Sequence, residues 1–443
     1  MVTNSKVFKC AKGSSFMENG YREFILDNGL FVAMQKTPTK TFSSSLRVFH
    51  GSANELPGEE GIAHFLEHVL VTGGTKKYSP HVAKEIVTGF GYFNARTYID
   101  NIDLEVSSLK DDLESYLDVA SEMAFSPRMN HEEIEEERAR ILREISDQKS
   151  NSFFKDRMDF TNALYGKSPY SQFVGGKESV IQAATSEDLF RYHQRGFSPN
   201  NSDLLLIGAL PDNTEDLVKK YFGSLPKGNG KRFEFPLLGP LENRTVFHRS
   251  ATDLVNKDNE QESNCLIWIG FRAPNLTQDE SYPMKIAASI LGEPGRLVSR
   301  LQGRLSTQLG LGYSASASYE LFLKAGSINI TTSVKATKKE EAIDAIFHEL
   351  KRLKTEPVSK IELAEVKKLA KFKIAGLYES NHGRGSIIIQ KVDFNQNPEE
   401  FLYKTEKVTR EDIIEAVNQY FPGSREDNNY VMLVRDPLKV SGK

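Results

Sequence analysis

Apolar residues recur with two different periods along this chain, and the two periods follow each other in the same order in each half. Every second residue is apolar at 102–106 and again at 328–330, which is typical of a half-buried strand. Each strand is followed by apolar residues three and four positions apart, which predict an amphipathic helix. These residues are Leu113, Tyr116, Leu117 and Ala120 in the first half, and Ile343, Ile346, Phe347 and Leu350 in the second.

A sequence repeat supports the same division. GFGYFNARTY at 89–98 aligns without gaps with GLGYSASASY at 310–319, an offset of 221 residues in a chain of 443. We therefore predict an α+β fold with two homologous domains, each a mainly antiparallel sheet packed by helices. The first domain covers 1–225 and the second covers 263–443, joined by the glycine-, proline- and charge-rich segment 226–262. Near the start, Asn28-Gly29 between two apolar runs predicts a hairpin with a type I′ turn.

The segment His64-Phe65-Leu66-Glu67-His68 has the spacing of a metal site on one helical turn. Positions i, i+3 and i+4 share a helix face, so both imidazoles can reach one ion beside Glu67. Histidine nitrogen suits zinc, and a catalytic zinc site typically needs a third protein ligand. The alternative is an amphipathic helix with two histidines on its polar side, since this spacing arises by chance in roughly one such chain in a hundred.

Candidates for the third ligand lie on a second predicted helix at 130–147. Ile134, Arg138, Ile141 and Ile145 follow a helical track there. Glu137 and Glu144 are seven residues apart, two helical turns, so they share a face and either could reach the ion. A run of glutamates is also typical of a solvated helix surface, and the spacing does not choose between these readings.

The motif HFLEH at 64–68, with glutamates at 137 and 144, resembles the M16 peptidases, the family of pitrilysin, insulysin and mitochondrial processing peptidase. The flanking GSANELPGEEGIAHFLEHVLVTGG and the stretch GFGYFNARTY are also similar to the first domain of that family. The resemblance implies one zinc ion per chain, held by His64, His68 and Glu144. It further implies Glu67 as the general base and Glu137 as a supporting acidic group.

The same resemblance implies how substrate is held. Asn94 and Ala95 would lie on the strand that pairs with the substrate backbone. Four such domains enclose a chamber in M16 relatives, so a two-domain chain implies a homodimer, or a heterodimer with an M16-like subunit. Active relatives commonly carry an arginine seven residues before the tyrosine that corresponds to Tyr313, and the pair helps to hold substrate. Here Ser306 stands at the arginine position, which implies weaker carbonyl polarisation or a partner that supplies the pair.

The second copy departs from the first at the metal motif. At the offset of 221, Lys285, Ala288 and Ser289 stand where the first copy has His64, Glu67 and His68. We therefore expect no metal site in the second domain. By resemblance, that domain forms the opposite wall of the substrate chamber.

Composition narrows the class of protein. With 39% hydrophobic residues, 26% charged residues and a net charge of −3, the chain is typical of a globular protein without a nucleic-acid partner. Its longest aliphatic runs, such as 204–207, fall far short of the about 20 residues that cross a bilayer. The N-terminus lacks the apolar core of a secretory signal and the arginine-rich pattern of a transit peptide, and the only cysteines are Cys10 and Cys265. These features favour a reducing compartment, the cytoplasm, and no membrane partner.

Together these features predict a zinc metalloendopeptidase that cleaves peptides or unfolded protein segments inside a dimeric chamber. The chain has no GxxxxGK[ST] phosphate loop and no GxSxG nucleophile elbow, so it signals neither a nucleotide hydrolase nor a serine hydrolase. The alternative is a non-catalytic or partner-dependent chamber subunit that binds polypeptide. Ser306 keeps that alternative open.

Overall fold

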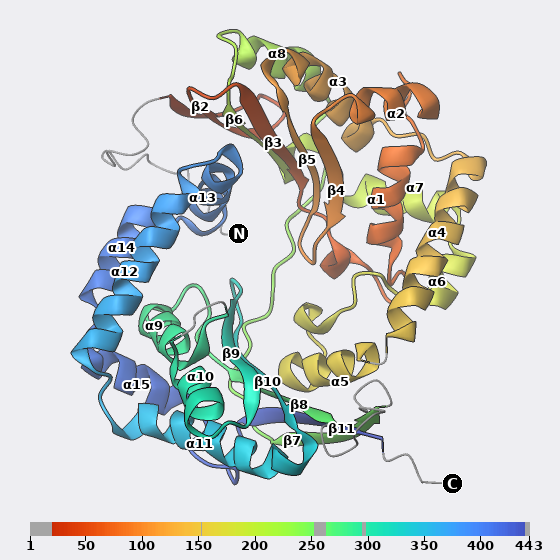
Figure 1. The fold of residues 1–443 in the computed structure, drawn as a ribbon. Helices are drawn as coiled ribbons and strands as arrows, with labels where there is room; N and C mark the ends of the chain where they lie inside the picture. Colours follow the sequence, from red (N-terminus) through yellow and green to blue (C-terminus); the bar gives the residue numbers. More distant parts are fainter. Residues whose placement is uncertain (1–19, 152, 252–262, 295–297, 439–443) are drawn as a thin grey trace, which may run out of the picture.

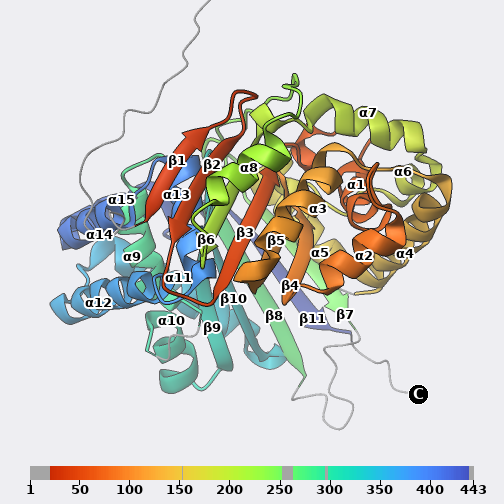
Figure 2. The ribbon, with the colours of Figure 1, turned by 90° about the horizontal axis from the view of Figure 1, so that it is seen from above.

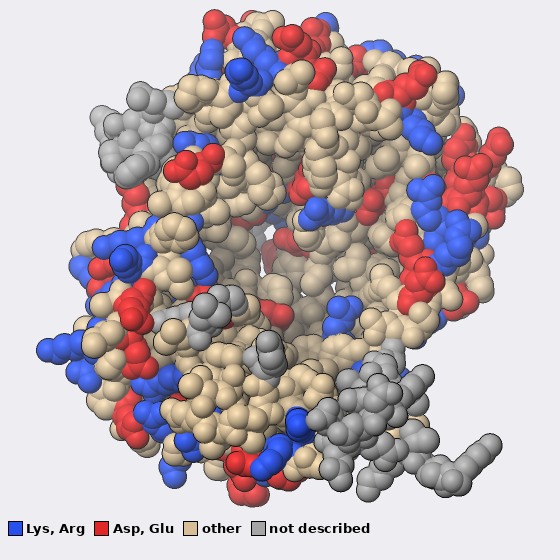
Figure 3. All heavy atoms as spheres, in the orientation of Figure 1, with Lys and Arg blue, Asp and Glu red and all other residues tan. Residues whose placement is uncertain are grey.

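The chain folds around two sheets that face each other across a central hollow (Figures 1 and 3). The structure is a computed structural model and describes residues 20–151, 153–251, 263–294 and 298–438. Seen from above, helices α4 (His131–Ser150) and α6 (Glu178–Ala183) lie at the opposite end of the molecule from α12 (Lys360–Leu377) and α14 (Pro398–Lys407) (Figure 2).

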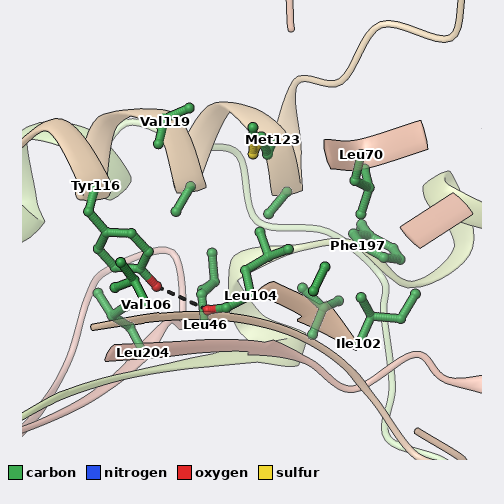
Figure 4. Close-up of a cluster of buried hydrophobic side chains, with 14 of the residues drawn as sticks. Leu46, Leu70, Ile102, Leu104, Val106, Tyr116, Val119, Met123, Phe197 and Leu204 are labelled. Carbon is green, nitrogen blue, oxygen red and sulfur yellow. Dashed lines mark hydrogen bonds between the residues drawn. The ribbon is translucent and has the colours of Figure 1, made fainter. Parts of the chain in front are cut away.

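The first sheet has six strands in the order β1-β2-β6-β3-β5-β4, and only β2 and β6 run parallel. One face packs against helices of the same half, including α1, α2, α3, α7 and α8. In this core Tyr116 is fully buried and donates its hydroxyl to the carbonyl of Leu104 at 3.1 Å (Figure 4). The strands are Tyr21–Ile25, Phe31–Lys36, Thr41–Val48, Tyr92–Thr97, Ile102–Leu109 and Ser202–Gly208, and the helices are Ile62–Thr72, Pro80–Thr88, Leu113–Phe125, Ser186–Gly196 and Thr214–Phe222.

The second sheet repeats this topology without the first edge strand. Its order is β7-β11-β8-β10-β9, and only β7 and β11 run parallel. Helices α9, α11, α12 and α15 pack on its apolar face. The strands are Thr245–Ala251, Asn264–Arg272, Gly312–Leu321, Gly326–Lys335 and Tyr430–Pro437, and the additional helices are Ser281–Gly292 (α9), Arg300–Gln302 (α10), Lys339–Thr355 (α11) and Arg410–Tyr420 (α15). The predicted α+β class with two sheets packed by helices is confirmed.

Each half lends one helix to the other half's sheet. Helix α5 (Phe154–Tyr165) packs on the second sheet, and α13 (Asn381–Phe394) packs on the first (Figure 1). Buried ion pairs accompany both contacts. Arg47 Nη1 lies 2.6 Å from Asp393 Oδ2 of α13, and Arg435 Nε lies 3.1 Å from Asp156 Oδ2 of α5. These contacts fix the two halves relative to each other across the predicted 226–262 junction.

The periodic segments fold as predicted. Residues 102–106 lie in β5, residues 328–330 lie in β10, and the two apolar helical patterns lie in α3 and α11. The predicted helix at 130–147 is α4, with Ile134, Ile141 and Ile145 buried. The predicted linker contains a strand, because β7 pairs with β11 of the second sheet. Its neighbours 252–262 lie outside the described residues, as does Cys10, while Cys265 is a buried free thiol.

The predicted type I′ turn is wrong, although the hairpin exists. Ile25 pairs with Phe31, which leaves a five-residue loop, and among its residues only Gly29 has a positive φ, of 92°. A type I′ turn needs a positive φ at both central residues. Instead the Gly29 N–H donates to the carbonyl of Leu26 at 2.8 Å and the Leu26 N–H donates to the carbonyl of Leu30 at 2.9 Å, which with the left-handed Gly29 makes a longer hairpin turn with a glycine bulge. The Asn28 side chain anchors this loop by donating to the carbonyl of Phe222 at 2.7 Å and that of Leu225 at 3.0 Å. Among the described helices, none has both the length and the apolar content to cross a bilayer.

Candidate metal centre and active site

Helix α1 begins at a tight backbone contact. Its N-cap Gly61 has a φ of 105°, and a Cβ atom there would meet Gly176 Cα at 2.9 Å. No hydroxyl or amide caps this end. Instead Glu55 Oε1 accepts from the N–H groups of Gly61 at 3.0 Å and Ala63 at 2.9 Å, which satisfies donors that have no partner within the helix.

One face of α1 packs in the hydrophobic core, and the other carries the candidate metal ligands. The residues Ile62, Ala63, Phe65, Leu66, Val69 and Leu70 are buried in the first core. His64, Glu67 and His68 share the other face and offer ligand atoms within 4.8 Å of one another. The Nε2 atoms of His64 and His68 lie 3.2 Å apart. The predicted convergence of the two imidazoles is therefore present in the fold.

Helix α4 packs beside α1 and gives its two candidate glutamates different positions around the histidines. Glu144 Oε2 lies 3.9 Å from His64 Nε2 and 3.8 Å from His68 Nε2. Glu137 is buried, and its Oε2 lies 2.8 Å from Nδ1 of His68, on the opposite side of that ring. Sequence spacing left the choice between the two open, whereas the geometry gives each a different place: Glu144 faces both Nε2 atoms, and Glu137 orients His68.

These three facing atoms fit a zinc ion. The point equidistant from His64 Nε2, His68 Nε2 and Glu144 Oε2 lies about 2.1 Å from each, which matches Zn–N and Zn–O bond lengths. Two imidazole nitrogens and one carboxylate oxygen are also a donor set that catalytic zinc uses, with a further coordination position left for water. Direct contacts of 3.8 and 3.9 Å would be too long for hydrogen bonds.

The local electrostatics differ between the two imidazoles. Burial, with a smaller effect of His68, lowers the pKa of His64 to about 4, so this ring is neutral and free to coordinate near neutral pH. Burial disfavours the charged form of His68, but the hydrogen bond with Glu137 and the nearby carboxylates together raise its pKa. Burial also raises the pKa of Glu67. The direction of this shift brings the carboxyl group closer to the condition in which it can both accept and release a proton.

A cleft leads away from these residues. Thr97 of β4 donates to Glu67 Oε2 at 3.1 Å, which ties the edge strand to α1. A cavity of about 670 Å³ is lined by His64, Glu67 and Glu144, by β4, by α5 and by residues of the second sheet. Ala95 lines this cavity, whereas Asn94 lies on β4 but is not among the lining residues. Among the strands that the structure describes, β4 pairs with β5 alone and forms the edge of the first sheet, and an unpaired strand edge is where an extended peptide can add.

The remaining predicted substrate group lies in the other half. Tyr313 falls within β9, but its side chain lies outside the described part of the structure. Ser306 lies in the π-helix Gly303–Gln308 and does not line the cavity at His64.

Sequence reasoning missed Thr97 and Glu55 as residues that position the site. Glu55 stands at the start of the loop that leads to α1, eight residues before Ala63, and only the folded loop brings its carboxylate to the helix end.

Comparisons with known proteins show the family to which both halves of the chain are similar. A family model described as Insulinase (Peptidase family M16) matches residues 31–171, and one described as Peptidase M16 inactive domain matches residues 183–370. A protein of Rickettsia bellii named as an uncharacterized zinc protease is 25% identical over 420 residues, covering 92% of this chain and 97% of its own. Mitochondrial-processing peptidase subunit beta of Saccharomyces cerevisiae is 25% identical over 420 residues, covering 90% of this chain and 88% of its own.

Solved structures share the fold. A protease from Helicobacter pylori superposes with a TM-score of 0.79 at 21% identity, covering 95% of this chain and all of the other. A peptidase M16 inactive domain from Pseudomonas fluorescens gives a TM-score of 0.81 at 18% identity, covering 94% and 98%. With family models matching in both halves and relatives aligned over most of their length, the chain belongs to the M16 peptidase family, whose relatives here include proteins named as zinc proteases.

Proposed function

We propose that this chain is a zinc endopeptidase that cleaves peptides or unfolded protein segments. The observation that carries the proposal is the convergence of His64 Nε2, His68 Nε2 and Glu144 Oε2 on one point, with Glu67 beside it. His64, His68 and Glu144 would hold the ion. Glu137 would position His68 through Nδ1, as acidic groups commonly do for metal-bound histidines.

Glu67 is the proposed general base. When bound, zinc lowers the pKa of a coordinated water and polarises the peptide carbonyl. Glu67 accepts the proton of the attacking water and passes it to the leaving amine. Thr97 holds the carboxylate of Glu67 toward the cleft, and the raised pKa of this carboxyl group suits both halves of the proton transfer.

The open edge of β4 is the proposed place for the substrate backbone. An extended peptide that adds to this edge is held by main-chain hydrogen bonds, so many sequences can be accepted. Ala95 of β4 lines the cavity, and Asn94 is its neighbour on the same strand. Folded proteins are excluded, because only an extended segment can pair with a strand edge.

A second M16-type subunit is the proposed partner. The hollow between the two sheets is open in a single chain (Figure 3), and a second chain would close it into a chamber. In a homodimer the opposing wall would present Tyr313 with Ser306 in place of the arginine. In a heterodimer the partner would supply the missing pair.

A non-catalytic chamber subunit is the competing function. Two observations favour it: Ser306 replaces the arginine, and the second half matches a family model described as an inactive domain. The grouping of His64, Glu67, His68 and Glu144 favours the enzyme, because a subunit that only binds polypeptide does not need these four side chains in one place.

Hydrolysis of a quenched fluorescent peptide of mixed sequence tests the proposal. We expect one zinc ion per chain, hydrolysis that a chelator stops, and a rate about 10²- to 10⁴-fold lower in Glu67→Gln with zinc content unchanged. Glu85→Gln, an exposed acid on α2, is the matched control and should keep full activity. A Glu67→Gln variant as active as wild type overturns the assigned role. A zinc-loaded wild type that cleaves only after mixing with an M16-type partner supports the heterodimer, and inactivity in every pairing supports the binding subunit.

A further inference from the structure

The second half contains a cavity that the proposed peptidase does not use. It has a volume of about 400 Å³ and lies among α9, α12, α13 and α14. Its walls are mainly apolar. They include Ile286, Leu369, Ile374, Leu377, Phe394 and Phe401. The polar lining includes two lysines and one glutamate, Lys285, Lys373 and Glu293, together with Ser289.

This cavity occupies the place that corresponds to the metal site. Helix α9 packs against α12 as α1 packs against α4, and both pairs cover the same face of equivalent sheets. The sequence repeat puts Lys285 and Ser289 at the positions of His64 and His68. Aligning the first residues of α4 and α12 puts Val366 and Lys373 at the positions of Glu137 and Glu144. All four residues line the cavity, so the second copy has kept the recess and changed its charge.

The charges in the cavity are not balanced. Glu293 is already engaged, since Ser289 Oγ donates to its Oε2 at 2.6 Å and Lys373 Nζ contacts its Oε1. Lys285 Nζ lies 4.4 Å from the centre of the Phe401 ring and has no hydrogen bond or ion pair within the described residues. The Lys285 side chain lines a recess of the protein. Solvent can reach it there, and the surrounding protein still lowers its pKa by burial. A positive charge there can be balanced by an anionic ligand.

We propose that this cavity binds a small apolar molecule with one carboxylate group, with the carboxylate on the Lys285 ammonium and the apolar part against the surrounding side chains. A single lysine outside the Glu293–Lys373 pair matches one negative charge and not the multiple charge of a phosphate. Apolar walls with a few polar groups are the usual composition of a small-molecule site. Two sources share this chemistry: a free fatty acid and the C-terminal residue of an apolar peptide.

Isothermal titration of the zinc-loaded full chain with decanoate tests the proposal. We expect saturable binding of one decanoate per chain, and a dissociation constant at least about tenfold higher in Lys285→Met, the effect of a lost hydrogen bond to a charged group. Lys368→Met, an exposed lysine on α12, is the control and should bind as wild type does. Both variants keep the zinc site, so a carboxylate that binds zinc contributes equally to each and cancels.

Decanol provides a comparison that needs no variant, because it has the same chain without the charge. It should bind at least tenfold more weakly than decanoate.

N-acetyl-Leu-Phe with a free or an amidated C-terminus distinguishes the two sources of the carboxylate. Binding of the free acid alone, lost in Lys285→Met, identifies a peptide terminus, and binding of decanoate alone identifies a free apolar acid. If neither acid saturates, or if both bind Lys285→Met as tightly as wild type, the proposal is overturned.

Discussion

The recess between α1 and α4 and the recess between α9 and α12 have the same architecture and opposite chemistry. In the first, two histidines and two glutamates gather where a cation fits. In the second, the corresponding positions carry Lys285, Ser289, Val366 and Lys373 around an apolar cavity. The helix pair and the sheet beneath it are therefore held in place by residues other than those that bind the ligand.

The buried faces of the two helices show why this is possible. Phe65, Leu66 and Val69 hold α1 in its core, and Ile286, Ile290 and Leu291 hold α9 in the other. The metal-facing positions of α1 lie on the opposite face and contribute little to this packing. Loss of the metal residues therefore leaves the helix in place, and a duplicated domain can change its ligand without losing its fold.

Restoring the ligands in the second half is the largest change that the comparison predicts. The triple variant Lys285→His, Ser289→His and Lys373→Glu should raise the zinc content from one to two per chain, because these positions correspond to His64, His68 and Glu144. The new site should bind about 10- to 100-fold more weakly than the first, because Val366 cannot orient a histidine as Glu137 does. Metal analysis after dialysis against buffered zinc measures both.

The matched control replaces Lys373→Glu by Lys368→Glu in the same double-histidine background. Lys368 is exposed on α12 and lies outside the cavity, so this variant offers two ligands to the recess and should not gain a second ion at the same zinc concentration. Equal zinc uptake by the two triple variants would show that α9 and α12 do not reproduce the geometry of α1 and α4.

Short-range patterns predicted much of this fold. The alternation at 102–106 and the helical spacing at 113–120 depend on local burial, so they identified β5 and α3 correctly. The repeat at 89–98 and 310–319 identified equivalent strands β4 and β9. A further repeat was overlooked: Thr185 with Asp188, and Thr409 with Asp412, form identical capping boxes at the starts of α7 and α15. That signal could have marked a second pair of equivalent helices.

Tertiary placement was not available from the sequence. Glu137 and Glu144 share a helix face, and only the position of α4 against α1 gives one to Nδ1 of His68 and the other to the Nε2 atoms. The exchange of α5 and α13 between the halves has no local signature either, because an apolar helix face does not specify which sheet covers it. The Asn28-Gly29 turn was assigned to the wrong class for a different reason: the same dipeptide also suits a longer hairpin loop in which Gly29 alone is left-handed.

Removing the group that orients His68 should give the next largest effect. Glu137→Ala leaves Nδ1 of the half-buried His68 without its acidic partner, so the zinc dissociation constant should rise about 10- to 100-fold. Competition with a fluorescent chelator measures this constant. Glu136→Ala, at the exposed neighbouring position of α4, removes the same charge from the helix and should leave it unchanged. Unaltered zinc affinity in Glu137→Ala would contradict the positioning role.

The smallest expected effect separates the two recesses by their pH dependence. The pKa of Lys285 is lowered by burial, so its charge is complete at lower pH and is lost as pH rises through a value below the ordinary 10.5 of lysine. Decanoate stays ionised over this range, so its binding should weaken with rising pH, by no more than the about tenfold expected for Lys285→Met. Zinc binding should instead strengthen as pH rises from acid values, because metal ligands must lose their protons.

Titrations of decanoate at pH values between about 7 and 10 measure the expected weakening of decanoate binding. Because Lys285→Met has no charge to lose there, its weaker binding should not depend on pH, and a parallel decline in that variant would show that another group causes it.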